Sequence, residues 1–205
     1  MPDLAKEVAN PKRLASKASK NKKVLEQVIE GISSEKAKIR FGCFKVLRIL
    51  SEDDPKTLYP HWDFFEEMLD NENTFLRANA VQIVANLTRV DSKNKFERLF
   101  DRYYTLMNDE SMITTANLIG VSGAVARVKP GLQTRITNKL LSIDETRHSP
   151  ECKNIIKGDA ILSFDKYFGE SKDKKRILDF VSKELKNRRP GTRKKAEKFM
   201  EKWGN

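Results

Sequence analysis

The chain has very little histidine and cysteine, the residues on which many enzymes and metal sites depend. Its 205 residues include two histidines, His61 and His148, and two cysteines, Cys43 and Cys152. Histidine is the commonest general base and metal ligand near neutral pH. The sequence also contains no glycine-rich phosphate loop, no His-Glu-x-x-His motif and no paired Cys-x-x-Cys. We therefore expect no enzymatic activity, no metal site and no cofactor.

Long apolar runs and a secretory leader are missing as well. No stretch of about 18 apolar residues occurs, so no segment is expected to span a membrane. The first residues, Met1-Pro2-Asp3-Leu4, lack the basic-then-apolar order of a signal peptide. The two distant cysteines make no disulfide framework. These absences predict a cytoplasmic protein with no membrane partner and no small-molecule substrate.

Positive charge is concentrated at the two ends of the chain. There are 40 Lys and Arg against 29 Asp and Glu, a net charge of +11. Residues 1–23 carry a net +5 (seven basic, two acidic) and residues 166–205 a net +8 (fourteen basic, six acidic), which leaves −2 for the rest. Such basic ends attract polyanions, and they also keep a protein in solution.

A similar segment recurs along the chain. Ile39–Leu50 aligns with Leu76–Leu87, and the same register returns three more times. The steps between aligned positions are 37, 38, 42 and 36 residues, and the longer step contains a short insertion near residues 146–150. Periods of this length are typical of helical repeat arrays. The aligned positions, called anchors below, are Arg40, Arg77, Thr115, Lys157 and Arg193.

The register predicts one buried face on each repeated segment. Positions three, six and ten after the anchors follow the spacing of one face of an α-helix. The first of these columns contains Cys43, Ala80, Leu118, Ala160 and Ala196. The second contains Val46, Ile83, Val121, Ser163 and Phe199, and the third Leu50, Leu87, Val125, Tyr167 and Trp203. Another apolar helix precedes each segment, and no strand-like alternation occurs, so the sequence predicts an all-α fold.

These helical pairs divide the chain into an array over residues 21–205. The approximate repeats are 21–57, 58–92, 93–130, 131–170 and 171–205. Residues 1–20 lie outside them, and Asn10-Pro11 is typical of a helix start. Leu14 and Ala18 would then pack on the first repeat as a cap, which repeat arrays need. A loose basic arm is the alternative.

Residues 69–80, with the sequence LDNENTFLRANA, resemble the turn and second helix of a HEAT repeat. In that family an Asp in the turn and an Arg early in the second helix form a polar ladder between repeats, and Asp70 and Arg77 match both positions. The match is partial elsewhere, because Ser33, Asn108 and Lys186 stand in place of the Asp. The resemblance covers about residues 21–203. It implies a right-handed α-α superhelix of about five helical hairpins, HEAT-like or armadillo-like, and it does not transfer a function.

In HEAT arrays the second helices line the concave surface, so the resemblance predicts where a partner would bind. The outward positions of these helices form a neutral, amide-rich strip with cations at its rim. Such a strip suits hydrogen bonding to a peptide backbone or to polar loops, and an ordinary solvated face is the alternative for each residue. The candidate groove residues are Lys45, Asn79, Gln82, Asn86, Arg89, Asn117 and Arg127.

The last repeat carries a dense basic cluster. Lys and Arg contacts to phosphate dominate non-specific nucleic-acid affinity. Aromatic residues for base stacking are sparse, because Phe199 and Trp203 fall in the expected core columns. The candidate nucleic-acid contacts are Arg188, Arg189, Arg193, Lys194, Lys195 and Lys198. The sequence thus favours a non-enzymatic scaffold that holds a protein partner in its groove, with a nucleic-acid-binding array using the basic ends as the alternative.

Two local features allow more than one interpretation. The adjacent carboxylates Asp109 and Glu110 are interpreted as solvated acids, because neighbours in sequence point to different faces of a helix. Gly120 and Gly123 interrupt an apolar helix at a cost of about 1 kcal/mol each relative to Ala. These glycines indicate either the close approach of a neighbouring helix or a hollow for a partner's side chain.

Overall fold

The computed structural model describes residues 4–204, and all regular structure in that part of the chain is helical. The all-α class expected from the sequence is therefore confirmed. Short 3-10 turns follow several of the α-helices. The α-helices are α1 (Leu4–Glu7), α2 (Pro11–Ala18), α3 (Lys22–Gly31), α4 (Ala37–Asp53), α5 (Pro55–Leu58), α6 (Trp62–Glu67), α7 (Thr74–Leu87), α8 (Lys95–Thr105), α9 (Met112–Val128), α10 (Gln133–Leu141), α11 (Pro150–Asp165), α12 (Lys174–Glu184) and α13 (Pro190–Trp203).

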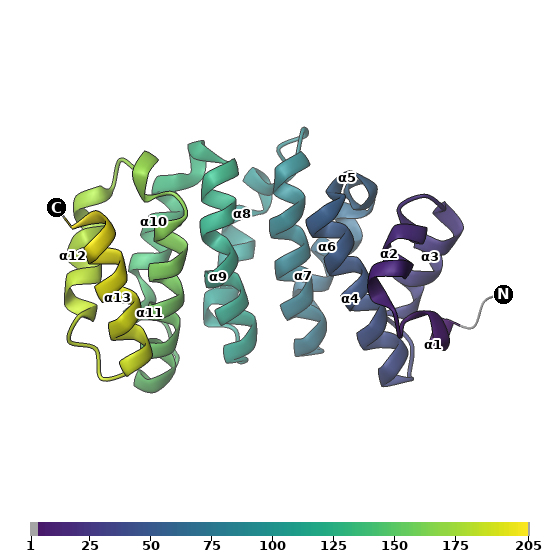
Figure 1. Cartoon of the computed structure of the whole chain (residues 1–205), viewed down its shortest axis with the longest axis horizontal. Coiled ribbons are helices and arrows are strands. Elements are labelled where there is room, and N and C mark those ends of the chain that lie inside the picture. The colour runs from purple at the N-terminus through teal and green to yellow at the C-terminus, as the bar shows by residue number, and fades with distance from the viewer. Residues whose placement is uncertain (1–3, 205) are drawn as a thin grey trace.

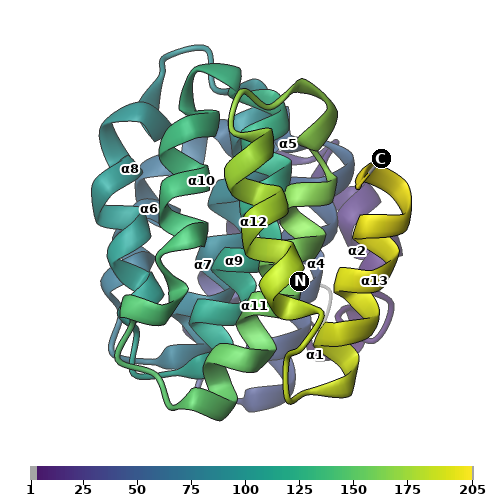
Figure 2. The same cartoon turned by 90° about the vertical axis from the view of Figure 1, so that its left-hand side faces the viewer.

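The helices stand side by side in the order of the sequence, from the N-terminal to the C-terminal end of the molecule (Figure 1). Helices α4, α7, α9, α11 and α13, here called the second helices, form a continuous row in which each contacts the next. Helices α3, α6, α8, α10 and α12 lie in a layer on one side of that row (Figure 2). Each second helix therefore buries one face and leaves another free.

Polar caps and prolines determine where several helices begin. Asn73 accepts a hydrogen bond from the Phe75 N–H at the start of α7, and Ser111 caps α9 in the same way. Such caps satisfy N–H groups that the first turn of a helix leaves unpaired. Proline is the first residue of α2, α11 and α13, where its missing N–H breaks no helical hydrogen bond.

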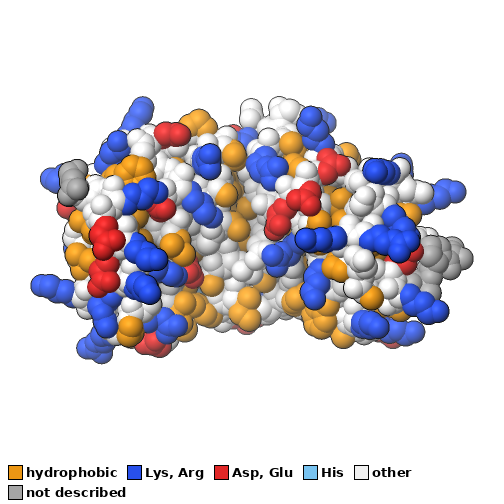
Figure 3. All heavy atoms as spheres, viewed as in Figure 1, with side chains coloured by type: hydrophobic (Ala, Val, Ile, Leu, Met, Phe, Trp, Pro, Cys, Tyr) orange, Lys and Arg blue, Asp and Glu red, His pale blue; other side chains and the backbone are white. Residues whose placement is uncertain are grey.

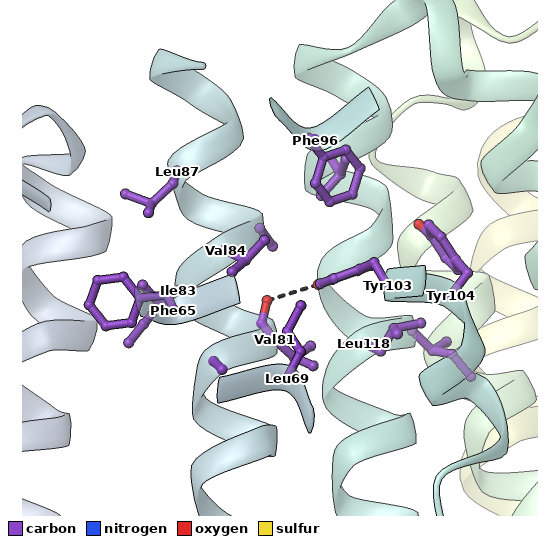
Figure 4. Close-up of a cluster of buried hydrophobic side chains, with 14 of the residues drawn as sticks. Phe65, Leu69, Val81, Ile83, Val84, Leu87, Phe96, Tyr103, Tyr104 and Leu118 are labelled. Carbon is purple, nitrogen blue, oxygen red and sulfur yellow. Dashed lines mark hydrogen bonds between the residues drawn. The ribbon is translucent and has the colours of Figure 1, made fainter. Parts of the chain in front are cut away.

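One hydrophobic cluster runs through the molecule, and it contains most of the expected core columns. The column three residues after the anchors is buried in every repeat, as are most positions of the other two. Trp62 and Tyr103 are among the largest buried side chains. The Tyr103 hydroxyl donates a 2.8 Å hydrogen bond to the carbonyl oxygen of Val81, which joins α8 to the preceding second helix (Figure 4). The core thus packs between repeats as well as within them.

Two positions of the expected stripe are only partly buried, Val121 and Trp203. In α9 the neighbouring residues Ser122 and Gly123 are buried instead. The Ser122 hydroxyl accepts a hydrogen bond from Tyr104 of α8, and Gly123 lies where α11 approaches the helix closely. Trp203 lies at the end of the last helix, where its ring packs on Phe168 on one side and remains accessible on the other. The buried positions therefore depart from the regular spacing of the sequence at these two places, where the helix packing differs.

The segment before residue 21 packs on the first helical pair. Leu14, Ala15 and Ala18 are buried, and α2 contacts both α3 and α4. Val8 covers Gly42 in α4, where an added Cβ would lie 2.4 Å from the Val8 Cβ. Residues 4–20 thus form a cap over the first pair, and residues 1–3 of the expected N-terminal segment lie outside the described residues.

The insertion before α11 folds back on the third helical pair. The His148 ring nitrogen Nε2 lies 2.9 Å from the Thr115 hydroxyl and 3.1 Å from the Met107 carbonyl oxygen. Thr115 occupies the anchor position that is Arg or Lys in the other repeats. The insertion therefore supplies a ring nitrogen at the repeat whose anchor carries no cation.

Candidate interaction surface

The free side of the second helices forms a broad surface, here called the second-helix face (Figure 3). Its middle carries few charged side chains, and lysine and arginine gather on both sides of that middle. The face contains the groove residues expected from the sequence. Their environments differ, however, and they are described here in turn.

Arginine anchors hold the turn that precedes three of the second helices. Arg77 Nη1 donates to the carbonyl oxygens of Asn71 and Glu72, at 2.7 and 2.9 Å. Arg40 and Arg193 make the same pair of contacts to carbonyl oxygens six and five residues before them. The guanidinium group thus closes the turn and sets the direction in which the second helix leaves it.

The polar bridge between the second and third repeats uses Asp109, and the assignment of Asp70 to it was wrong. Arg77 Nε and Nη2 donate to the two carboxylate oxygens of Asp109 at 2.8 and 3.1 Å, and Nη2 also contacts Glu110 at 3.1 Å. Asp70 instead pairs with Arg102 at the surface. The interpretation of Asp109 as a solvated acid was also wrong, because only 8% of the residue is exposed. The correct partner lies 32 residues beyond Arg77 and follows from the stacking of repeats.

The bridge alters the ionisation of Asp109. Burial alone would raise the pKa of its carboxyl group, but hydrogen bonds from Arg77 and from the Ser111 N–H outweigh burial and hold the pKa below its usual value. Asp91 has a similar environment. Burial is opposed there by the Phe96 and Lys95 N–H groups, and the net pKa is again lowered.

The amide strip connects neighbouring second helices through its nitrogen atoms. Gln82 Nε2 donates to Asn117 Oδ1 at 2.8 Å, and Asn117 Nδ2 donates to the Ala78 carbonyl oxygen at 3.4 Å. Asn86 Nδ2 donates to Ser51 Oγ at 2.9 Å, and Asn79 Nδ2 donates within its own helix. The side-chain oxygens of Asn79, Gln82 and Asn86 accept no hydrogen bond from residues 4–204. The strip therefore holds the repeats together with its donors and presents its acceptors outward.

The cations at the rim of the strip fall into two groups. Arg89 donates to the Glu52 carbonyl oxygen at 2.7 Å and so ties the 3-10 turn after α7 to α4. Lys45 and Arg127 are exposed, and neither forms an ion pair within the described residues. These two side chains remain available for a partner.

The two glycines of α9 have different surroundings. A Cβ on Gly123 would lie 2.2 Å from the Ser163 carbonyl oxygen, so this glycine permits the close approach of α11. A Cβ on Gly120 would meet no atom within 4 Å. Its carbonyl oxygen accepts a 3.2 Å hydrogen bond from Lys166, which crosses from α11 to α9 on the second-helix face. The close-approach interpretation therefore holds for Gly123 and not for Gly120.

The expected C-terminal basic cluster is divided between two sides of α13. Arg189 pairs with Glu151, and Lys195 pairs with Asp159 at 2.9 Å, while Arg193 closes its own turn. Arg188 lies in the turn before α13 and lines a separate hollow with Glu151 and Asn154 at the start of α11. The structure brings together Lys194, Lys195 and Lys198 with a further lysine, Lys202.

These four lysines border a groove between α11 and α13, here called the lysine groove. It has a volume of about 410 Å³ and is lined by Ile161, Leu162, Asp165, Gly191, Lys194, Lys195, Lys198, Phe199 and Lys202. Leu162 is 48% exposed. The sequence does not show this groove, because a groove depends on the separation of two helices and residue spacing along the chain does not give that separation.

Reactive groups are sparse in the structure. No group of three or more His, Cys, Asp and Glu side chains suited to a metal ion occurs within residues 4–204. Burial raises the pKa of the Cys43 thiol to about 11, so this thiol stays protonated and unreactive at neutral pH. Across the same residues, no helix has both the length and the apolar character needed to cross a membrane.

Comparison of the chain with protein-family models, with curated proteins and with solved structures gives no match. The interpretation of the second-helix face therefore depends on its own geometry.

Proposed function

We propose that the chain is a right-handed α-α superhelix of the HEAT-like class and acts as a non-enzymatic scaffold that binds a protein partner on its second-helix face. The orientation of the amide strip is the observation that supports this function best. The side-chain nitrogens are used within the array, and the oxygens of Asn79, Gln82 and Asn86 are left as acceptors.

Outward acceptors favour a protein partner over a nucleic acid. A peptide backbone offers N–H donors that can pair with amide oxygens, whereas the phosphate oxygens of a nucleic acid are themselves acceptors. The division of the C-terminal basic cluster also weakens the nucleic-acid alternative, because Arg189, Arg193 and Lys195 have partners within the array. Fewer lysines and arginines then remain free to contact successive phosphates of a nucleic-acid backbone.

The proposal is tested by selecting short peptides that bind the protein from a random displayed library and measuring their affinity by fluorescence anisotropy. The double variant Asn79→Ala/Asn86→Ala removes two outward oxygens and keeps the Gln82–Asn117 bond. The matched control, Gln27→Ala/Asn138→Ala, removes two amides from α3 and α10 in the other layer. We expect the first variant to weaken binding about tenfold, which corresponds to about 1.4 kcal/mol, and the control to leave it unchanged.

Two results would contradict the proposal. The first is a set of selected peptides whose affinity is the same for the strip variant and for the wild type. The second is duplex DNA or RNA binding that persists at physiological salt and is lost when Arg188, Lys194 and Lys198 are changed to Glu. That outcome would support the nucleic-acid alternative, since binding through phosphates falls steeply with salt and with each cation removed.

A further inference from the structure

The lysine groove combines two features that rarely face solvent together. Its floor is apolar, with Ile161 and Phe199 buried below and Leu162 standing half exposed between the two helices. Its rim holds four lysines against one acidic lining residue, Asp165. An apolar group of a ligand that covered the exposed part of Leu162 would gain free energy from the burial of apolar surface.

The rim lysines are not equivalent. Lys195 pairs with Asp159 at 2.9 Å and Lys202 with Asp165 at 2.8 Å, so the array neutralises these two. Lys194 and Lys198 are exposed and form no ion pair or hydrogen bond within residues 4–204. They lie four residues apart in α13, hence on the same side of the helix, where two like charges repel one another. An anionic ligand would relieve that repulsion.

We propose that the lysine groove docks an acidic segment of the protein partner, with one bulky apolar side chain placed on Leu162 and Asp or Glu residues beside it pairing with Lys194 and Lys198. This inference rests on the proposed function, and it names one chemical class of partner segment and the end of the second-helix face that receives it. An amphipathic acidic peptide fits both features of the groove. Its Asp and Glu residues complement the positive rim, and its apolar side chain complements the apolar floor.

Other polyanions fit the groove less well. A nucleic acid would bring phosphates over an apolar floor, and Phe199, the aromatic residue among those that line the groove, is only 3% exposed and offers no face for stacking. A lipid surface is contacted by apolar groups that protrude, whereas the apolar floor here lies inside a groove of about 410 Å³. Both ligands are therefore included in the test as competing outcomes.

The test uses the full chain and a short fluorescent peptide in which Leu and Phe are flanked by Asp and Glu. Binding is measured by anisotropy at physiological salt for the wild type and for Lys194→Glu/Lys198→Glu. The matched control is Lys172→Glu/Lys175→Glu, which changes the net charge equally at exposed positions before and within α12. We expect the groove variant to bind at least about tenfold more weakly and the control to bind like the wild type.

Two further arms separate specific docking from general attraction between charges. A peptide with Lys in place of every acid should bind the Lys194→Glu/Lys198→Glu variant better than it binds the wild type. A peptide with Ser in place of Leu and Phe, and the Leu162→Ser variant, should each lower the affinity severalfold. Leu162 is half exposed, so its replacement leaves the fold intact, which a thermal melt checks.

The inference is overturned if the acidic peptide binds all variants equally, or if the Ser-substituted peptide binds as tightly as the original. It is also overturned if the lysines are needed for duplex DNA, RNA or anionic lipid vesicles while the acidic peptide fails to bind. Failure of the proposed function gives a different result, because it is judged by peptides that depend on Asn79 and Asn86. If the acidic peptide fails to bind while the peptides that depend on Asn79 and Asn86 still bind, only the proposal for the lysine groove fails and the proposed function stands.

Discussion

Helices α7 and α13 begin with the same arginine turn, but the two arginines differ in what else they contact. Arg77 in the middle of the molecule also holds the buried carboxylate of Asp109 in the next repeat. Arg193 in the last pair has its two carbonyl contacts and no carboxylate partner within residues 4–204. Arg77 thus joins two repeats through a buried carboxylate, and Lys157 joins the fourth and fifth repeats in the same way through Glu184, which is 5% exposed. Arg193 holds only its own turn.

This difference separates polar groups that join neighbouring helices from polar groups that have no such contact. In the middle, Arg77–Asp109 and Gln82–Asn117 use their polar groups across repeat boundaries. At the C-terminal end, Lys194 and Lys198 form no ion pair or hydrogen bond to a neighbouring helix within residues 4–204, and Leu162 is half exposed beside them. Changes in the middle should consequently affect stability, and changes at the rim of the lysine groove should affect binding.

The largest loss of stability is expected for Arg77→Ala. The change leaves the buried Asp109 carboxylate without its main partner, and breaking a buried ion pair on one side costs about 3–5 kcal/mol. Arg193→Ala, which removes only bonds to carbonyl oxygens, should cost about 1–2 kcal/mol. Urea unfolding of both variants measures the difference.

A double-mutant cycle makes that comparison sharper. In the Arg77→Ala variant the Asp109 carboxylate stays buried without its main partner, and Asp109→Ala removes it. The double variant Arg77→Ala/Asp109→Ala should therefore lose less free energy of unfolding than the two single variants lose in sum. If Arg77→Ala and Arg193→Ala lowered the free energy of unfolding equally, the bond to the buried carboxylate would contribute nothing to stability. The difference proposed between the middle and the end of the molecule would then be wrong.

The two glycines of α9 test how closely the middle helices pack. Gly123→Ala should cost about 1–3 kcal/mol, because the new Cβ would meet the Ser163 carbonyl oxygen and force α9 and α11 apart. Gly120→Ala should instead stabilise the protein by up to about 1 kcal/mol, because open space surrounds its Cβ and alanine favours a helix. Thermal melts of the two variants should shift in opposite directions. A Gly123→Ala variant that melts at or above the temperature of the wild type would refute the close approach at Gly123.

Acid should weaken the middle of the molecule through Asp109 and Asp91. The pKa of each carboxyl group is lower in the folded chain than in the unfolded chain, so each stabilises the fold fully above the unfolded value of about 4. This contribution is lost as the pH falls below about 4 and through the folded pKa. The free energy of unfolding, measured against pH, should therefore decline more steeply in the wild type than in Asp109→Asn.

Asp101→Asn provides the control for that experiment. This change removes an exposed carboxylate that pairs with Arg135 at the surface. It should leave most of the acid dependence in place, since surface pairs contribute little. If Asp109→Asn and Asp101→Asn gave the same pH dependence, the bridge to Arg77 would not be the source of the effect.

The buried face of the second helices could be predicted from the sequence, because every repeat places a small or apolar residue three positions after its anchor. The partner of Arg77 could not, since Asp109 lies in the following repeat and is found only when the repeats are stacked. The amide residues of the strip are visible in the sequence, but the direction in which each side chain points depends on the hydrogen-bond partners that the adjacent helix offers. Ser51 and the Ala78 carbonyl oxygen decide that direction for Asn86 and Asn117.

The lysine groove lay beyond sequence reasoning for a similar reason. Leu162 and the lysines of α13 belong to different helices, and no spacing along the chain shows that they border one groove. The basic cluster also looked continuous in sequence, whereas Arg188 lies in the turn before α13, beside the start of α11, and Lys194 lies within α13 at the groove.

The smallest change in stability is expected for Lys194→Ala/Lys198→Ala. Neither lysine forms a bond within residues 4–204, and their mutual repulsion four residues apart ends when both are removed. The double variant should thus equal the wild type or exceed it by a few tenths of a kcal/mol in urea unfolding. A loss of more than about 1 kcal/mol would make these lysines structural, as the polar groups of the middle repeats are. If the double variant is as stable as the wild type but binds the acidic peptide more weakly, the two lysines contribute to binding and not to the stability of the fold.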